Sequence, residues 1–349
     1  MKKTKRVLTF CIVAALLISL VTGVAAVRRL LPHEEYHGIY EKLQNGRYVN
    51  ILIVGDSIGE GTGASGREHQ WFWLLAEWLQ QTYGVEYTLT NISMGGNTSY
   101  AGYAREMTLD DGIEYDLAII CYGENDSEEG FSSNYEAIIR GIREKYLACS
   151  MISILESSQK TYTNKIQEIQ RLADYYGIPV ADTIGAFQES GYPYDDLAED
   201  GTHPGDIGQR LYFETVRDII LDQTAKNVSF EKAELEPVNR DVTEYDHFRY
   251  FPADHFTRVD ELTWEIKTDQ ISGKIGIHRR YDSGDCTLKV FADDVLFKEA
   301  AIDWQYEFSQ THFDKLSEEI CTVERNIKLV FASTEQADGF EGLLFTGQW

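Results

Sequence analysis

The amino-acid sequence predicts an α/β domain built on a parallel sheet, followed by an all-β domain. Between Tyr48 and Ile220, short apolar segments alternate with longer amphipathic segments. This alternation is typical of βαβ units, whose parallel sheet is covered by helices on both faces. After about Asn227 the helical segments stop, and short alternating segments separated by turn residues indicate a small sandwich.

Each element of the α/β domain follows from its hydrophobic pattern. A short apolar run predicts a strand buried on both faces, and apolar residues three or four positions apart predict a helix that packs on the sheet. The expected strands are Val49–Val54, Tyr87–Ile92, Asp116–Cys121, Cys149–Leu155 and Ile178–Ala181. The expected helices are Gln70–Tyr83, Asn134–Tyr146, Thr161–Tyr176 and Asp206–Leu221.

The all-β domain is expected after a charged, proline-containing link at Glu231–Arg240. Its expected strands are Thr263–Lys267, Gly273–His278, Thr287–Phe291, Asn326–Phe331 and Gly342–Phe345. The predicted organisation is therefore a targeting segment at residues 1–30, a juxtamembrane linker at 31–47, an α/β domain at 48–226 and a β-sandwich-like accessory domain at 236–349.

The N-terminus has the pattern of a targeting segment. Four basic residues among the first six precede Val7–Val27, an uncharged stretch of 21 residues, which is about the length of a membrane-spanning helix. A cleaved signal peptide has a shorter apolar core, so the length favours an uncleaved anchor, with cleavage near Ala26 as the alternative. In both cases the body of the protein is expected outside the cytoplasmic membrane, because the basic N-terminus stays inside.

The overall charge limits the classes of partner. The chain has 57 acidic and 32 basic residues, and its formal net charge is −25. A nucleic-acid-binding protein needs a basic face, so this composition argues against nucleic acid as a partner.

Five cysteines are few for an exported protein. Cys121 is expected at the end of one strand and Cys149 at the start of the next, which are opposite ends of a parallel sheet, so a disulfide between them is not expected. Cys286 and Cys321 are the one pair suited to a disulfide, and burial as free thiols is the equal alternative.

Four short blocks stand where a parallel sheet usually binds its ligands, at strand ends or just before the last helix. They are Gly55-Asp56-Ser57, Gly95-Gly96-Asn97, Gly123-Glu124-Asn125-Asp126 and Asp200-Gly201-Thr202-His203-Pro204.

The first and last blocks contain the groups needed for nucleophilic attack by a serine. A serine attacks an ester carbonyl only if a base takes its proton, and His203 is the candidate base for Ser57. Asp200 is placed to bond the other imidazole nitrogen, which would fix the tautomer and stabilise the imidazolium. Ser57 by itself would be interpreted as a turn or N-cap residue, so the coincidence of all four blocks carries the prediction.

The middle blocks supply donors for the oxyanion that forms during acyl transfer. The candidates are the backbone N–H of Ser57, the backbone N–H of Gly96 and the side-chain amide of Asn125. Glycine at position 96 permits close approach of the backbone and a positive φ. Asp56, Gly123 and Asp126 are expected to support these loops rather than to react.

The four blocks, in this order, resemble those of SGNH (GDSL-type) hydrolases from Val49 to about Leu221. The resemblance implies a flavodoxin-like three-layer α/β/α fold, Ser57 as nucleophile and His203 and Asp200 as the rest of a triad. It also implies Gly96 and Asn125 in the oxyanion hole, and hydrolysis of acyl, carbohydrate or lipid esters without a metal or cofactor. Gly205 departs from the family, whose members often carry asparagine there.

Two other motifs have simpler explanations. His33-Glu34-Glu35-Tyr36-His37 matches the zinc pattern H-E-x-x-H, but it follows Pro32 at the expected membrane edge and has no apolar face, so no metal is expected. The glycine-rich run from Gly61 to Gly66 begins six residues after Gly55 rather than at the strand end, which argues against a dinucleotide fingerprint. We expect a flexible lip over the serine instead.

The sequence therefore predicts an exported serine esterase that hydrolyses short acyl esters, most simply O-acetyl groups on a carbohydrate. Three alternatives remain open at this point. The same triad would serve an O-acyltransferase acting on a cell-wall polymer or exopolysaccharide, or a lipase-type acylhydrolase. The body would also suit an inactive surface-binding module.

Overall fold

The computed structural model describes residues 38–228, 236–281, 285–303 and 309–347. The chain from Gly38 onward forms one compact unit. The predicted targeting segment and the H-E-x-x-H motif lie outside the described residues. Within the described ranges, no helix combines the length and the hydropathy needed to cross a membrane.

The first part of the chain is built on a five-stranded parallel sheet, as predicted. The strands lie in the order β2-β1-β3-β4-β5, which is the flavodoxin-like order. The order reverses between β1 and β3, so the carboxyl ends of β1, β2 and β3 meet at the switch point where such sheets bind ligands. The strands are β1 (Val49–Gly55), β2 (Tyr87–Asn91), β3 (Leu117–Cys121), β4 (Ser150–Leu155) and β5 (Val180–Asp182).

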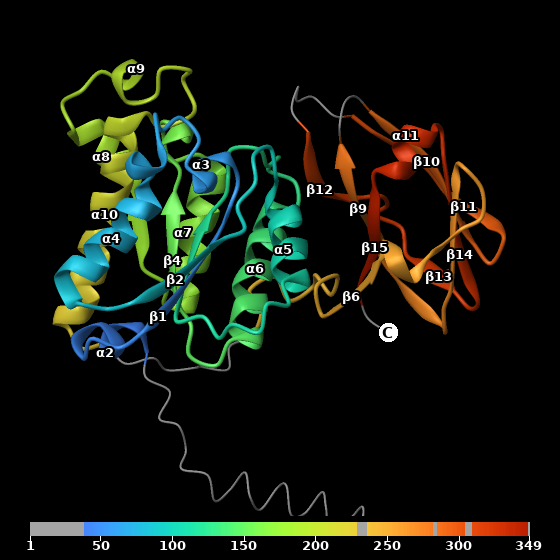
Figure 1. Ribbon diagram of the computed structural model, residues 1–349, viewed down its shortest axis with the longest axis horizontal. Coiled ribbons are helices and arrows are strands. Elements are labelled where there is room, and N and C mark those ends of the chain that lie inside the picture. The colour runs from blue at the N-terminus through green and yellow to red at the C-terminus, as the bar shows by residue number, and fades with distance from the viewer. Residues whose placement is uncertain (1–37, 229–235, 282–284, 304–308, 348–349) are drawn as a thin grey trace, which may run out of the picture. The chain divides into compact units, whose positions relative to one another are not determined.

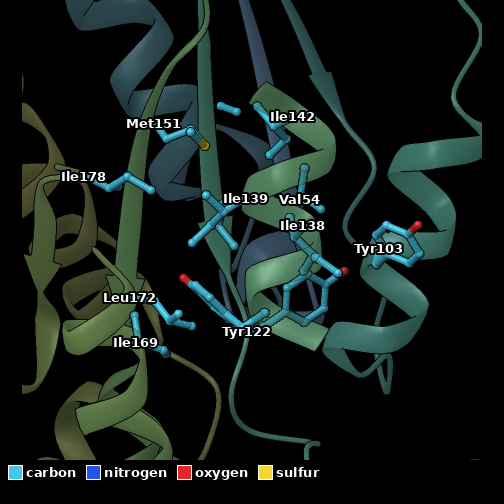
Figure 2. Packing of buried hydrophobic residues seen from close by; sticks show 14 of the residues in the cluster. Val54, Tyr103, Tyr122, Ile138, Ile139, Ile142, Met151, Ile169, Leu172 and Ile178 are labelled. Atoms are coloured by element: carbon cyan, nitrogen blue, oxygen red, sulfur yellow. The ribbon is translucent and has the colours of Figure 1, made fainter. Parts of the chain in front are cut away.

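Helices cover both faces of this sheet, with α4 and α10 on one side and α5 and α6 on the other (Figure 1). Alternate residues of β1 explain the two layers, since Ile51 and Ile53 join one buried cluster and Leu52 and Val54 the other. Figure 2 shows part of the second cluster, to which Val54 of β1 and Ile138 of α6 both belong. The larger helices are α4 (Trp71–Tyr83), α5 (Ser99–Thr108), α6 (Phe131–Lys145), α7 (Asn164–Tyr176) and α10 (Asp206–Ala225).

The structure also contains helices that the hydrophobic pattern did not predict. The predicted linker is wrong beyond residue 38, because α2 (Ile39–Gln44) buries Ile39, Tyr40 and Leu43 in the core. The other helices absent from the prediction are α5, α3 (Ser57–Glu60), α8 (Thr183–Glu189) and α9 (Tyr194–Leu197).

The second part of the chain is mostly antiparallel strands, as predicted. Two sheets, β11-β10-β14-β8-β7 and β12-β9-β15-β6, enclose a separate apolar cluster, and β13 pairs with β9. The strands are β6 (His247–Pro252), β7 (Thr257–Arg258), β8 (Thr263–Lys267), β9 (Ile271–Tyr281), β10 (Cys286–Ala292), β11 (Val295–Ile302), β12 (Gln310–Lys315), β13 (Cys321–Val323), β14 (Asn326–Phe331) and β15 (Phe340–Gly347), with the short helix α11 (Thr334–Asp338) before β15.

The four cysteines of the described residues are buried free thiols. Cys286 and Cys321 are therefore buried as free thiols and not joined in a disulfide, and they act as small apolar side chains in the core of the β part.

The β part packs on the α/β part through β12 and α5. Phe313 of β12 is 2% exposed and belongs to the same buried cluster as Tyr103 of α5. The guanidinium of Arg105 on α5 donates to the carbonyl of Thr311 at 2.9 Å. The two parts thus share a core rather than meeting only at polar surfaces.

Candidate active site

Ser57 is the first residue of α3 and directly follows β1. Asp56 is the N-cap of this helix, because its carboxylate accepts from the Ile58 N–H at 2.8 Å. The indole N–H of Trp71 donates to the carbonyl of Ile58 at 3.1 Å, which ties α3 to α4. These contacts hold the Ser57 backbone at the sheet end, where the residue is 8% exposed.

The structure brings Ser57, His203 and Asp200 into one hydrogen-bonded chain. The Nε2 atom of His203 lies 2.9 Å from Ser57 Oγ, and its Nδ1 atom lies 2.6 Å from Asp200 Oδ2. With the imidazole proton on Nδ1, His203 donates to Asp200 and accepts from the serine hydroxyl. That is the arrangement that lets an imidazole take the serine proton.

The loop that carries Asp200 holds it in its charged form. Burial would raise the pKa of Asp200, but the hydrogen bonds from the His203 ring and from the backbone N–H groups of His203 and Thr202 lower it to about 2. The two backbone bonds are 2.7 and 2.9 Å long. Asp200 is therefore a carboxylate at any ordinary pH, and it orients the imidazole without competing for its proton.

The glycine-rich run after α3 packs against this loop. A Cβ atom at Gly63 would lie 2.5 Å from the Pro204 carbonyl oxygen and 3.0 Å from His203 Cβ. The backbone N–H and the hydroxyl of Ser65 bond the Asp206 carboxylate at 2.8 and 2.7 Å. The glycine-rich run is therefore not the flexible lip that was predicted, because it packs against the loop that contains His203.

Two of the predicted oxyanion donors are backbone groups. Among the described residues, neither the N–H of Ser57 nor the N–H of Gly96 has a hydrogen-bond acceptor. Gly96 has a φ of +71°, a conformation that glycine adopts without strain.

The third predicted donor, Asn125, makes contacts inside the protein. Its amide nitrogen lies 3.1 Å from the Asn97 carbonyl and 3.2 Å from Asp56 Oδ2. The amide would therefore exchange one of these bonds in order to donate to a substrate.

The supporting residues hold the loops in two ways. Asp126 accepts from the backbone N–H of Ser99 at 2.9 Å and from its hydroxyl at 2.6 Å, at the start of α5. Gly123 has a φ of +151°, and its carbonyl accepts from Lys165.

Several residues around this site were not predicted from the sequence. Glu156, directly after β4, is fully buried and accepts from the Glu124 N–H at 2.7 Å. It also hydrogen-bonds Asp56, and burial raises the pKa of both carboxyls. Its place at a strand end was the one signal available, since Ser57 and Asn125 have similar positions.

Glu60 and Gln310 hold the loop that contains Gly96. Glu60 Oε2 accepts from the Gly95 N–H at 3.0 Å, and Gln310 Nε2 donates to the Gly95 carbonyl at 2.6 Å. Glu60 lies three residues after the serine, whereas nothing in the sequence links Gln310, 215 positions away, to this loop.

A metal-binding cluster is not a feature of this site. In the part of the chain that the structure describes, no three histidine, cysteine, aspartate or glutamate side chains are grouped to hold an ion. The reactive groups of the site are a serine hydroxyl, an imidazole and a carboxylate.

Comparison with known proteins agrees with this fold. Residues 53–211 match the GDSL-like lipase/acylhydrolase family. A crystal structure of a two-domain esterase active on acetylated mannans, co-crystallised with mannopentaose, superposes with a TM-score of 0.69 and 16% identity, covering 89% of this chain and 94% of the other. A second structure described as the same kind of esterase gives a TM-score of 0.65 and 18% identity over the same shares. No curated protein sequence matches the chain significantly.

The matched residues include the serine block, the two glycine-containing blocks and the histidine block, and the sheet order is that of the family's fold. The α/β part of this chain is a domain of the GDSL-like lipase/acylhydrolase (SGNH) family, and the protein is a serine carboxylic ester hydrolase.

Proposed function

We propose that this protein is an exported esterase that removes acetyl groups from a carbohydrate, with Ser57, His203 and Asp200 as its catalytic triad. The observation that carries the proposal is the 2.9 Å contact between Ser57 Oγ and His203 Nε2, with Asp200 at 2.6 Å on the other side of the ring. A serine paired in this way with an oriented base is an activated nucleophile.

In the first half of the reaction, Ser57 Oγ attacks the acetyl carbonyl carbon while His203 Nε2 takes the hydroxyl proton. The carbonyl oxygen becomes an oxyanion that accepts from the N–H groups of Ser57 and Gly96, and from Asn125 once its amide leaves Asn97. His203 then gives its proton to the departing sugar oxygen, and the acetyl group remains on Ser57.

In the second half, a water molecule replaces the sugar. His203 takes a proton from the water as its oxygen attacks the acetyl-serine carbonyl, and then returns that proton to Ser57 Oγ as acetate leaves. The same donors stabilise the second oxyanion, and Asp200 stabilises the imidazolium in both halves.

Support for the substrate class comes from the whole two-domain arrangement. The similar structure that spans both parts of this chain is described as an esterase active on acetylated mannans. Support for export comes from the basic N-terminus followed by Val7–Val27, a segment that favours an anchor over a cleaved signal.

The test is acetate release from acetylated manno-oligosaccharides and from p-nitrophenyl acetate. We expect both activities in the native protein and a loss of at least ~10³-fold in Ser57→Ala. Activity in Ser57→Ala equal to that of the native protein would remove the proposal. Faster cleavage of p-nitrophenyl palmitate than of the acetate would indicate a lipase, and acetyl mass gained by a glycan acceptor would indicate a transferase.

A further inference from the structure

The peptide bond between Gly95 and Gly96 contains one of the proposed oxyanion donors. Its N–H belongs to Gly96 and its C=O to Gly95. A peptide unit is planar, so these two groups point in fixed, opposite directions. Any group that holds the Gly95 carbonyl therefore also fixes where the Gly96 N–H points.

The segment is intrinsically free to rotate. Two adjacent glycines have no Cβ atoms to restrict φ and ψ, and Gly96 has a positive φ of +71°. Such a segment keeps one orientation only if neighbouring groups impose it. The neighbours of Gly95 are therefore the groups that align the donor.

Two side chains hold the Gly95 peptide groups from opposite directions. Glu60 Oε2 accepts from the Gly95 N–H at 3.0 Å, on the peptide unit before the donor. Gln310 Nε2 donates to the Gly95 carbonyl at 2.6 Å, on the donor's own peptide unit. Asn97 Nδ2 also approaches this carbonyl, but at 3.3 Å.

Gln310 comes from the β part, where its strand is firmly anchored. Gln310 is the first residue of β12, which pairs with β9. The carbonyl of the next residue, Thr311, accepts from Arg105 at 2.9 Å. The buried ring of Phe313 has its centroid 5.6 Å from the guanidinium carbon of the same arginine. Because Arg105 is on α5, just after the Gly95-Gly96 loop, β12 and the loop are fixed to the same helix.

We propose that Gln310 is a positioning residue that aligns the Gly96 N–H with the oxyanion. The inference rests on the proposed function, since it needs Gly96 to be an oxyanion donor. A donor aligned before the substrate arrives needs no reorganisation in the transition state, which is the source of its effect. A hydrogen bond to the carbonyl also polarises the same amide and strengthens the N–H as a donor.

This role predicts a change in turnover rather than in substrate binding. The bound ester has no oxyanion, which develops only as the serine attacks, so misalignment of its donor should lower kcat and leave KM nearly unchanged. Full loss of one such donor costs ~10²–10³-fold in kcat, and loss of alignment alone should cost about 10-fold.

The experiment compares full-length Gln310→Ala and Gln310→Met with the native protein. Methionine keeps the length of glutamine without a donor, so it separates the hydrogen bond from the packing. The matched control is Gln336→Ala, because Gln336 Nε2 also donates to a carbonyl in the β part, that of Asp285 at 2.9 Å. The substrate is p-nitrophenyl acetate, and the melting temperature is measured alongside.

The expected result is a kcat about 10-fold lower in both Gln310 variants, with KM within about twofold and the control at native activity. The Ki of a trifluoromethyl ketone, which adds to the serine and forms an oxyanion, should rise by the same factor as kcat falls.

Native kcat in both Gln310 variants would overturn the inference, as would an equal fall in Gln336→Ala. The proposed function fails separately, through undiminished activity in Ser57→Ala.

Discussion

Asp56 and Glu156 are two fully buried carboxyls that hydrogen-bond each other beside the nucleophile. Burial raises the pKa of both carboxyls. The charge of Asp56 raises the pKa of Glu156 further, whereas the hydrogen bond from Glu156 lowers the pKa of Asp56, which Asp126 and Glu124 raise. We infer that the pair keeps a shared proton near neutral pH. That proton lets Asp56 accept from Ile58 and from Asn125 without two charges meeting in the core.

This pair predicts how stability depends on pH. A carboxyl whose pKa is raised by folding holds its proton more tightly in the folded state than in the unfolded state. Its contribution to the free energy of unfolding is therefore complete below the unfolded pKa near 4, and it is lost as pH rises towards the folded pKa. Glu156→Gln replaces the protonated partner with a neutral amide. We expect its free energy of unfolding to fall less steeply than that of the native protein between pH 5 and pH 8.

Urea denaturation at several pH values measures the free energy of unfolding of the native protein and of Glu156→Gln. The two should differ by about 1.4 kcal/mol for each unit of raised carboxyl pKa that the variant lacks. Glu128→Gln is the control, since Glu128 is exposed and, among the described residues, its carboxylate bonds only the Asn164 side chain. Parallel stability curves for the native protein and Glu156→Gln would show that the pair does not share a proton.

At the level of residues, the sequence predicted the groups whose chemistry is recognisable in a short motif. Ser57, Asp200 and His203 stand in local blocks with a known chemical logic, and the structure places them together. Gln310 could not be predicted, because its contact with Gly95 depends on the packing of β12 against α5 and leaves no local pattern.

At the level of elements, α5 (Ser99–Thr108) connects the Gly95-Gly96 loop to the rest of the fold. Its apolar positions are tyrosines and alanines around a central glycine, which is a weak helical signal, and the helix was not predicted. The helix is buried through Tyr100 and Tyr103 and through small residues that let it approach its neighbours closely. The apolar runs of β1, β3 and β4 were predictable because strands covered on both faces need continuous apolar sequence.

At Gly102, α5 lies very close to Tyr122. A Cβ atom there would lie 2.5 Å from the ring and hydroxyl of Tyr122. Gly102→Ala should therefore lower the free energy of unfolding by ~1–3 kcal/mol through overpacking, although alanine favours the helix itself. Thermal or urea unfolding measures the loss.

The matching control is the double variant with Tyr122→Leu, which removes the ring that the new methyl group meets. We expect the double variant to lose less stability than the sum of the two single variants. Simple additivity would mean that the close contact is relieved elsewhere and does not limit the position of α5.

At the level of the whole molecule, the two parts share one buried cluster. Phe313 of β12 and Leu344 of β15 belong to the cluster that includes Tyr100 and Tyr103 of α5. The β part is therefore joined to the α/β part by buried apolar contacts. The sequence predicted two domains from their different patterns, but it held no sign of this joint core.

Phe313→Ala tests the shared core. The substitution should cost ~3–5 kcal/mol and should separate the unfolding of the α/β part from that of the β part. Phe331→Ala is the control, because Phe331 is equally buried but lies in the β part's own cluster. Coincident far-ultraviolet and near-ultraviolet circular dichroism transitions are expected for the native protein, and two separate transitions there would contradict a joint core.

The proposed mechanism depends on Ser57 as the nucleophile and on its activation by His203. Reaction of the full-length protein with a fluorophosphonate, followed by peptide mapping in a mass spectrometer, tests it most directly. We expect one covalent adduct on the Ser57 peptide, none in Ser57→Ala and reaction at least ~10³-fold slower in His203→Ala. An adduct on another residue, or undiminished ester hydrolysis without any adduct at Ser57, would contradict it.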